Sequence, residues 1–355
     1  MKIAILGAGH GGVAAAAHMA LDGHEVRLFQ VPQFEESFKA IRETKQLRLS
    51  GIWRQGLAPL HVATHNPQEA LSGAEVVLVI VPAFAQESMA RLCGPYLEDG
   101  QYVFLLPGGF GSYLFGKVLA EMGIRKDITL GETSTLPYGA RMVDQNEVAI
   151  HIRAVFNPFA AYPASRTNKA CRVLARLYPE VCPANNILDV ALNNTNPCIH
   201  PVPTLLSASR IEYSQGEFWL YREAMTPSVW RVMRSLDQER VEVRKAFGLG
   251  EPHCELPEEV GRVFIDQFGY EGIEAGRKMK GPKTLTDRYL TEDVPMGLVF
   301  YSSMGRIAGV PTPIIDSVIH LVSHLLGTDL WSEGRNLRTL GLEGTSVEEL
   351  ISRLQ

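Results

Sequence analysis

The 355-residue sequence lacks the features that mark membrane proteins, disulfide-rich proteins and nucleic-acid-binding proteins. No stretch approaches about 18 consecutive apolar residues, so no membrane-spanning helix is expected. The five cysteines are odd in number and form no CxxC pair, which argues against a disulfide framework and a thiolate zinc site. With 34 basic and 39 acidic side chains and no block of like charges, the chain offers no electrostatic surface for nucleic acid or a membrane.

No export signal is expected from the first residues of the sequence. The apolar run 3–6 stops at Gly7, and no cleavage-type site follows a longer hydrophobic segment. We therefore expect a cytoplasmic location, in which the cysteines stay reduced.

The first half of the chain alternates short apolar runs with helix-like stretches. The expected strands are 3–6, 26–29, 76–81, 102–106, 128–131 and 147–155, all in one sheet. Helices are expected between them, for example at 13–21 and 85–97. Strand and helix alternating at this spacing predict βαβ units, so residues 1–187 should form a doubly wound α/β domain.

Long helical patterns replace the short strands in the second half. A helix is expected at 228–247, between Thr226-Pro227 and Gly248, and another from Pro313 to 326, before Gly327. Ser346 and Glu349 have the spacing of a capping box for a last short helix. Residues 188–355 should therefore form an all-α domain.

The first expected strand leads into a G-x-G-x-x-G motif, Gly7-Ala8-Gly9-His10-Gly11-Gly12, and an alanine-rich helix follows. In this context the motif is typical of the Rossmann dinucleotide-binding domain. The first glycine permits the tight turn, the second lets the backbone approach a pyrophosphate, and the third lets helix and strand pack closely. The helix N-terminus adds N–H groups and a partial positive charge. Gly7, Gly9, His10, Gly11 and Gly12 are therefore expected to bind NAD or NADP.

Other cofactor-binding residues are expected where further strands end. The second strand ends in Gln30, where NAD-dependent enzymes usually carry a carboxylate that binds the ribose hydroxyls. Glutamine can bind a ribose but does not repel a 2′-phosphate, so NAD and NADP both stay open. Later strands end at Pro82-Ala83 and Pro107-Gly108, where small residues leave room for a cofactor.

Residues 193–203 combine several amides, three prolines and His200 at the start of the helical region. This composition indicates a site, and Asn194, Asn196 and Thr204 could supply neutral hydrogen-bond donors around the histidine. Further along, Arg288 and Asp293 supply a cation and a carboxylate. A carboxylate paired with the histidine would fix its tautomer and stabilise its charged form. No metal is expected, because His320 and His324 lack the glutamate of the zincin motif.

The chain resembles the opine dehydrogenases of the octopine/nopaline type over essentially its whole length. The resemblance rests on the order and spacing of short motifs at 7–12, 131–134, 194–196, 200–201, 203–206, 288–289, 292–294 and 310–313. It implies a Rossmann domain followed by a helical substrate domain, with the active site between them. Such enzymes reductively condense a 2-oxo acid, such as pyruvate, with the amino group of an amino acid, using NADH or NADPH.

By position, the resemblance makes His200 the catalytic histidine, Asp293 the carboxylate paired with it, and Arg288 a binder of a substrate carboxylate. Gln30 departs from the aspartate of close NAD-dependent relatives. A homodimer is expected.

Two alternatives remain from the residues themselves. One is a ketopantoate-reductase-like 2-oxo-acid reductase, which would depend on a lysine such as Lys280 or Lys283 instead of His200. The other is a dinucleotide-binding regulator without turnover, which would bind the cofactor and never oxidise it.

Overall fold

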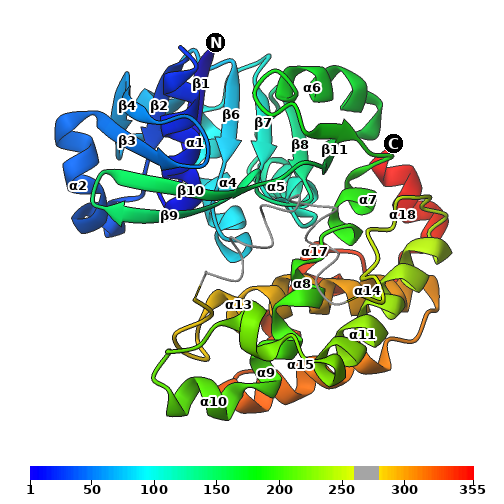
Figure 1. Ribbon diagram of the computed structural model, residues 1–355. Helices are drawn as coiled ribbons and strands as arrows, with labels where there is room; N and C mark the ends of the chain where they lie inside the picture. The colour runs from blue at the N-terminus through cyan, green and yellow to red at the C-terminus, as the bar shows by residue number, and fades with distance from the viewer. Residues whose placement is uncertain (260–279) are drawn as a thin grey trace. The chain divides into compact units, whose positions relative to one another are not determined.

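The computed structural model describes residues 1–259 and 280–355 and contains two compact units, Met1–Val190 and Ala191–Gln355 (Figure 1). Helix α7 (Ile187–Leu192) spans the point where one unit gives way to the other. The boundary expected from the sequence lies between residues 187 and 188.

An eight-stranded sheet forms the centre of the first unit, in the order β12-β11-β8-β7-β6-β1-β2-β5. The strands are β1 (Lys2–Leu6), β2 (Glu25–Phe29), β5 (Val62–Thr64), β6 (Val76–Val79), β7 (Tyr102–Leu105), β8 (Thr129–Thr133), β11 (Asn157–Tyr162) and β12 (Val181–Pro183). All neighbouring pairs are parallel except β8 and β11, which are antiparallel. Figure 1 shows β2, β1, β6, β7 and β8 side by side. The predicted Rossmann-like α/β fold is confirmed.

A second sheet in the same unit corrects one prediction. β10 (Glu147–Arg153) does not extend the large sheet but belongs to a four-stranded sheet of order β4-β3-β10-β9. Its partners are β9 (Tyr138–Asp144), which forms a hairpin with it, and β3 (Gln46–Gly51), with β4 (Gly56–Pro59) at the edge. Apolar periodicity predicts a strand, but it carries no information about which strand pairs with it.

Both faces of the large sheet are buried. Ile3 and Ile5 of β1 point into one core cluster, together with α1 (His10–Leu21) and the inner side chains of the small sheet. Ala4 and Leu6 point into a second cluster, which includes residues of three helices: α3 (Pro67–Leu71), α4 (Gln86–Cys93) and α5 (Gly111–Glu121). Burial on both faces explains why the strand sequences are continuously apolar.

The second unit is helical within the described residues, and no strand occurs at 200–259 or 280–355. Its helices are α8 (Asn196–Ile199), α9 (Pro201–Leu206), α10 (Ala208–Tyr213), α11 (Pro227–Ala246), α13 (Arg288–Thr291), α14 (Val299–Ala308), α15 (Pro313–Leu326), α16 (Leu330–Glu333), α17 (Leu337–Leu340) and α18 (Val347–Leu354). Proline stands in the first turn of α11 and α15, and Gly327 ends α15 with φ +66°. The predicted capping box of Ser346 and Glu349 begins α18.

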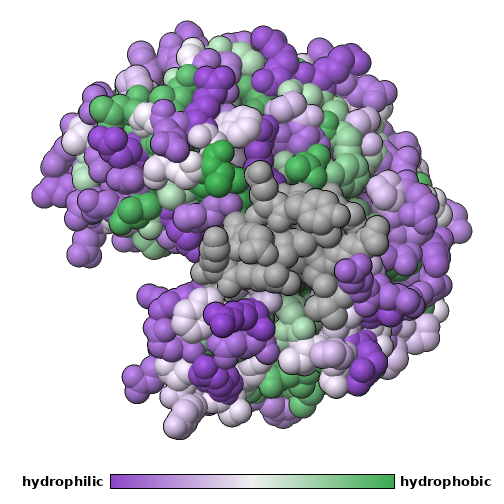
Figure 2. All heavy atoms as spheres, in the orientation of Figure 1, coloured by the Kyte–Doolittle hydropathy of each residue, from purple (hydrophilic) through white to green (hydrophobic). Residues whose placement is uncertain are grey.

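None of the described helices is both long and apolar enough to cross a membrane. On the face that Figure 2 shows, hydrophilic residues dominate and apolar ones lie in small separate groups. Isolated exposed apolar side chains of this kind are normal for a folded chain.

His18 on α1 is a buried titratable group in the core of the first unit. Its Nδ1 lies 3.2 Å from the Tyr138 hydroxyl, and its Nε2 lies 3.3 Å from a carboxylate oxygen of Asp22. Burial lowers the pKa of His18 to about 4, although Asp22 opposes the shift. In the unfolded chain the imidazole regains its ordinary pKa of 6.5.

We expect His18 to make the first unit less stable as the pH falls from 6.5 to 4. In this window the unfolded chain binds a proton that the folded chain does not, so the free energy of unfolding decreases by about 3 kcal/mol in total. Urea denaturation across this pH range should show a steeper loss for the wild type than for His18→Gln, which cannot titrate. Parallel curves for the two proteins would contradict the prediction.

Candidate active site

The expected cofactor-binding residues of the first unit follow strands that end in register. Leu6 pairs with Phe29 and with Val79, and Val79 pairs with Leu105. The structure therefore brings the expected residues that follow these strands to one edge of the large sheet: Gly7, Gly9, His10, Gly11, Gly12, Gln30, Pro82, Ala83, Pro107 and Gly108. The carboxyl edge of a parallel sheet is where doubly wound folds bind their ligands.

The glycines of the motif have the distinct environments that a bound pyrophosphate requires. A Cβ at Gly7 (φ +106°) would lie 2.4 Å from the Ile80 carbonyl oxygen, and one at Gly12 would lie 1.8 Å from the Gly7 carbonyl oxygen. These two glycines are needed for the turn and for close packing of α1 on β1. A Cβ at Gly9 would have no atom within 4 Å, so the surface there is open. The residues fit a dinucleotide at the N-terminus of α1, where no side chain caps the helix.

The side chains of His10 and Gln30 each accept a hydrogen bond from a backbone amide. The exposed His10 ring accepts a hydrogen bond at Nδ1 from the Met142 amide, 2.9 Å away. Gln30 is buried, and its Oε1 accepts from the Val31 amide at 3.0 Å. Because Oε1 is engaged with the backbone, Gln30 differs from a ribose-binding carboxylate, whose two oxygens both accept.

Arg42, the first arginine after Gln30 along the chain, is engaged with an acid. Arg42 forms an ion pair with Glu35 at 2.5 Å, and Glu35 also lies 2.6 Å from His65 Nε2. The hydrogen bonds from Arg42 and His65 lower the pKa of Glu35. The charge of Arg42 is therefore partly neutralised at this position, and the structure leaves both NAD and NADP as cofactors.

His200 and Asp293 meet in the second unit, although 92 residues separate them along the chain. His200 lies between α8 and α9, and Asp293 begins a π-helical segment, Asp293–Leu298. His200 Nδ1 lies 2.8 Å from Asp293 Oδ2, and the side chains are only 13% and 17% exposed. A carboxylate only accepts, so the Nδ1 hydrogen is directed at Asp293, and Nε2 is the ring nitrogen that can exchange a proton.

Two tyrosines that the sequence analysis did not single out contact the His200 ring. The Tyr221 hydroxyl lies 3.0 Å from Nε2, and the Tyr289 ring stacks on the imidazole with centroids 4.1 Å apart and planes 11° apart. Tyr221 belongs to a second π-helical segment, Leu220–Ala224. Such segments often occur at functional sites. Tyr289 adjoins Arg288 in a motif that carried the resemblance, whereas Tyr221 had no signal in the sequence.

The expected substrate-binding residues differ from one another in exposure and in hydrogen-bond partners. The Arg288 side chain is 63% exposed and its Nε donates to Glu292. Asn194 and Asn196 are half-buried, and Asn194 Oδ1 accepts from the Asn196 amide at 3.1 Å. Thr204 is fully buried, and its hydroxyl donates to the His200 carbonyl at 2.7 Å. In this structure Thr204 therefore holds the backbone of His200 and has no surface for a substrate, contrary to the expectation from its position in the sequence.

Each of the two units matches a known protein family. Residues 2–122 match the N-terminal domain of NAD-dependent glycerol-3-phosphate dehydrogenase, and residues 183–326 match the α-helical domain of NAD/NADP octopine/nopaline dehydrogenase. The opine dehydrogenase of Arthrobacter sp. (strain 1C) is 35% identical over 99% of this chain and 98% of its own length.

Solved structures share the fold over nearly the whole chain. Octopine dehydrogenase with NADH and pyruvate superposes with a TM-score of 0.75 at 19% identity, covering 99% of this chain and 98% of that one. Yersinopine dehydrogenase with NADP⁺ gives a TM-score of 0.70 at 15% identity, covering 100% and 97%. Given the two matched domains and the close relative over its full length, the chain belongs to the opine dehydrogenase family, NAD(P)-dependent oxidoreductases that act on CH–NH groups.

Proposed function

We propose that the enzyme reductively condenses a 2-oxo acid such as pyruvate with the amino group of an amino acid, and catalyses the reverse oxidation. The observation that carries the proposal is the hydrogen bond between His200 Nδ1 and Asp293 Oδ2, formed by two residues that the family resemblance assigns to catalysis. The geometry suits acid–base chemistry, because Asp293 holds Nδ1 and leaves proton exchange to Nε2, which faces the Tyr221 hydroxyl.

The roles of the residues follow from their positions. When bound, the reduced dinucleotide supplies the hydride. His200 donates a proton from Nε2 to the imine nitrogen as the hydride reaches the imine carbon, which gives the secondary amine, and it removes the amine proton in the oxidative direction. Asp293 orients the ring and stabilises its charged form. Tyr221 contacts Nε2, and Tyr289 covers one face of the ring, so both limit the orientations that the imidazole can adopt.

A condensation of this kind has two substrates that each carry a carboxylate, so the site needs a cationic anchor. Arg288 lies five residues before Asp293, and most of its side chain is exposed. A guanidinium can bind a carboxylate through two parallel hydrogen bonds, which fixes orientation as well as charge. We therefore assign Arg288 to a substrate carboxylate, with the amides of Asn194 and Asn196 as neutral donors.

Arg288→Lys should raise the KM for one of the two substrates roughly tenfold, equivalent to about 1.4 kcal/mol, because lysine keeps the charge but loses the paired donors. Steady-state kinetics with each substrate varied in turn would measure the change. Arg231→Lys is the matched control, since Arg231 is an exposed arginine on α11 that donates to Ser228. If both KM values and kcat of Arg288→Lys stay within about twofold of the wild type, another group holds the carboxylate.

The proposed reaction can be tested by following NADH and NADPH oxidation with pyruvate across a panel of L-amino acids. Oxidation should require both substrates, and mass spectrometry should identify the product as a secondary amine dicarboxylate. Oxidation with pyruvate alone would instead indicate a 2-oxo-acid reductase. Cofactor binding without oxidation under any condition would indicate a regulator.

We propose that the protein is a homodimer located in the cytoplasm. A two-fold dimer is the commonest closed assembly of identical chains. The odd number of cysteines and the lack of a CxxC pair in the sequence suit a reducing compartment. Light scattering should give twice the 39.2 kDa of one chain. A molar mass equal to one chain would contradict the dimer.

A further inference from the structure

The loop between β7 and α5 lies at the carboxyl edge of the large sheet, and two of its residues have backbone angles that are rare in proteins. Gly109 and Phe110 both have left-handed backbone angles, with φ +58° and +72°. For a bulky side chain such as phenylalanine this conformation is uncommon and persists only where the surroundings enforce it. The loop contains Pro107 and Gly108, which are among the proposed cofactor-binding residues.

Glu132 on β8 holds one side of this loop. The side chain is completely buried, and its Oε1 accepts a hydrogen bond from the Phe110 amide at 2.6 Å. Its Oε2 accepts from the Ser112 amide at 2.8 Å and from the Ser112 hydroxyl. One carboxylate thus binds three donors at the N-terminus of α5, where the helix dipole favours a negative charge.

Gln86 of α4 holds the other side. It is 1% exposed, and its Nε2 donates to the carbonyl oxygens of Pro107 and Gly108 at 3.1 and 3.0 Å. A Cβ at Gly108 would lie 2.2 Å from Glu132 Cβ, and one at Gly111 would lie 2.1 Å from Gln86 Oε1. The loop and the two side chains are therefore packed as one unit, without room for a side chain at either glycine.

The strand order gives the loop its place along the cofactor. The glycine motif follows β1, and Gln30, the expected ribose contact, follows β2 on one side of it. β6 and β7 lie on the other side of β1. A dinucleotide with its pyrophosphate at the motif and its adenosine over β2 must extend its nicotinamide half over β6 and β7.

We propose that Glu132 is a positioning residue, which holds the β7–α5 loop in the conformation that binds the nicotinamide half of the cofactor. This inference rests on the cofactor placement of the proposed function. Glu132 does not contact the cofactor in this scheme, and it acts through the backbone from Pro107 to Ser112. The segment 131–134, which contributed to the family resemblance, thereby gains a physical role.

Glu132→Gln is the principal test, because glutamine keeps the shape but replaces an acceptor oxygen with a donor that faces an N–H or O–H group. The dissociation constants of NADH and of ADP-ribose, which lacks the nicotinamide, are measured by calorimetry. We expect NADH to bind about tenfold or more weakly, while the affinity for ADP-ribose stays within about twofold. In the cofactor-free protein, the amides of Phe110 and Ser112 should exchange hydrogen faster than in the wild type.

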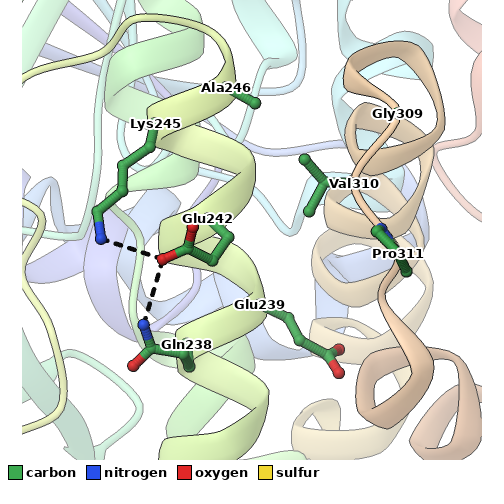
Figure 3. A pocket seen from close by; sticks show the side chains of 8 residues that line it. All are labelled: Gln238, Glu239, Glu242, Lys245, Ala246, Gly309, Val310 and Pro311. Carbon is green, nitrogen blue, oxygen red and sulfur yellow. Dashed lines mark hydrogen bonds and ion pairs between the residues drawn. The ribbon is translucent and has the colours of Figure 1, made fainter.

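Glu239→Gln provides the matched control in the helical unit. Glu239 accepts from the Ile314 and Ile315 amides at 2.8 and 2.9 Å, so it binds the N-terminus of α15 as Glu132 binds that of α5. It lines a surface groove between α11 and the segment before α15, beside Glu242 and Lys245 (Figure 3). The same chemical change at Glu239 should leave the affinities for both ligands unchanged.

Comparing the affinities for NADH and ADP-ribose distinguishes a role of Glu132 in the loop from a role in the stability of the whole unit. Equal losses of NADH and ADP-ribose affinity would show that Glu132 stabilises the whole unit, and unchanged NADH affinity would show that the loop is not needed for binding; either result overturns the proposal. If Glu132→Gln does not fold, Gln86→Met removes the donor on the other side of the loop without changing charge, and the same selective loss of NADH affinity is expected. Both measurements are independent of condensation activity, so failure of the proposed reaction and failure of this inference are distinguishable.

Discussion

Replacing His200 with alanine should lower turnover by about 10²–10⁴-fold, the usual contribution of a positioned acid–base group. The nitrogen that exchanges the proton is lost, together with the hydrogen bonds to Asp293 and Tyr221. The affinity for NADH should stay unchanged, because the cofactor-binding residues belong to the other unit. Steady-state kinetics and calorimetry on the same variant would measure both quantities.

His324→Ala is a suitable control, since His324 is an exposed histidine on α15 of the same unit. It should retain the activity of the wild type. Wild-type turnover in His200→Ala would refute the assignment of His200, and a large loss of NADH affinity would show that the substitution had disturbed more than proton transfer.

Replacing Gly9 with valine should abolish NADH binding. A side chain at this position meets no protein atom within 4 Å of its Cβ, so the folded chain can accommodate it. It would instead occupy the path along which the pyrophosphate approaches the N-terminus of α1. Calorimetry should detect no binding, while the melting temperature of the cofactor-free protein stays close to that of the wild type.

Gly250→Val is the matched control, because a Cβ at Gly250 also meets no atom within 4 Å and Gly250 lies in the helical unit. It should bind NADH normally. Gly12 gives the opposite contrast: its Cβ would lie 1.8 Å from the Gly7 carbonyl oxygen, so a substitution there should destabilise the fold itself. Unchanged NADH affinity in Gly9→Val would contradict the placement of the pyrophosphate.

The fold class could be predicted because it depends on local patterns. Continuous apolar runs of four to six residues indicate strands that are buried on both faces, and the alternation of strand and helix then leaves few topologies. Proline in the first turn and glycine at the end predicted α11 and α15 to within a residue or two. These signals act within a few residues of each other, so the sequence displays them directly.

The small sheet shows that local patterns do not predict which strands pair. The segment 147–155 was predicted correctly as a strand but assigned to the wrong sheet, because β10 pairs with β9 and β3 instead of a strand of the large sheet. Pairing depends on which edges the chain brings together, and the hydrophobic period of one strand is the same for any partner.

By itself, the sequence determined the two kinds of domain, the glycine motif and, through the family motifs, the identities of His200, Asp293 and Arg288. Only the tertiary structure decided that Tyr221 contacts His200 and that Glu132 and Gln86 hold the loop at Phe110. The physical reason is distance along the chain. A cap or a buried strand is specified by neighbouring residues, whereas these contacts join residues on different elements and exist only once packing has fixed the elements against one another.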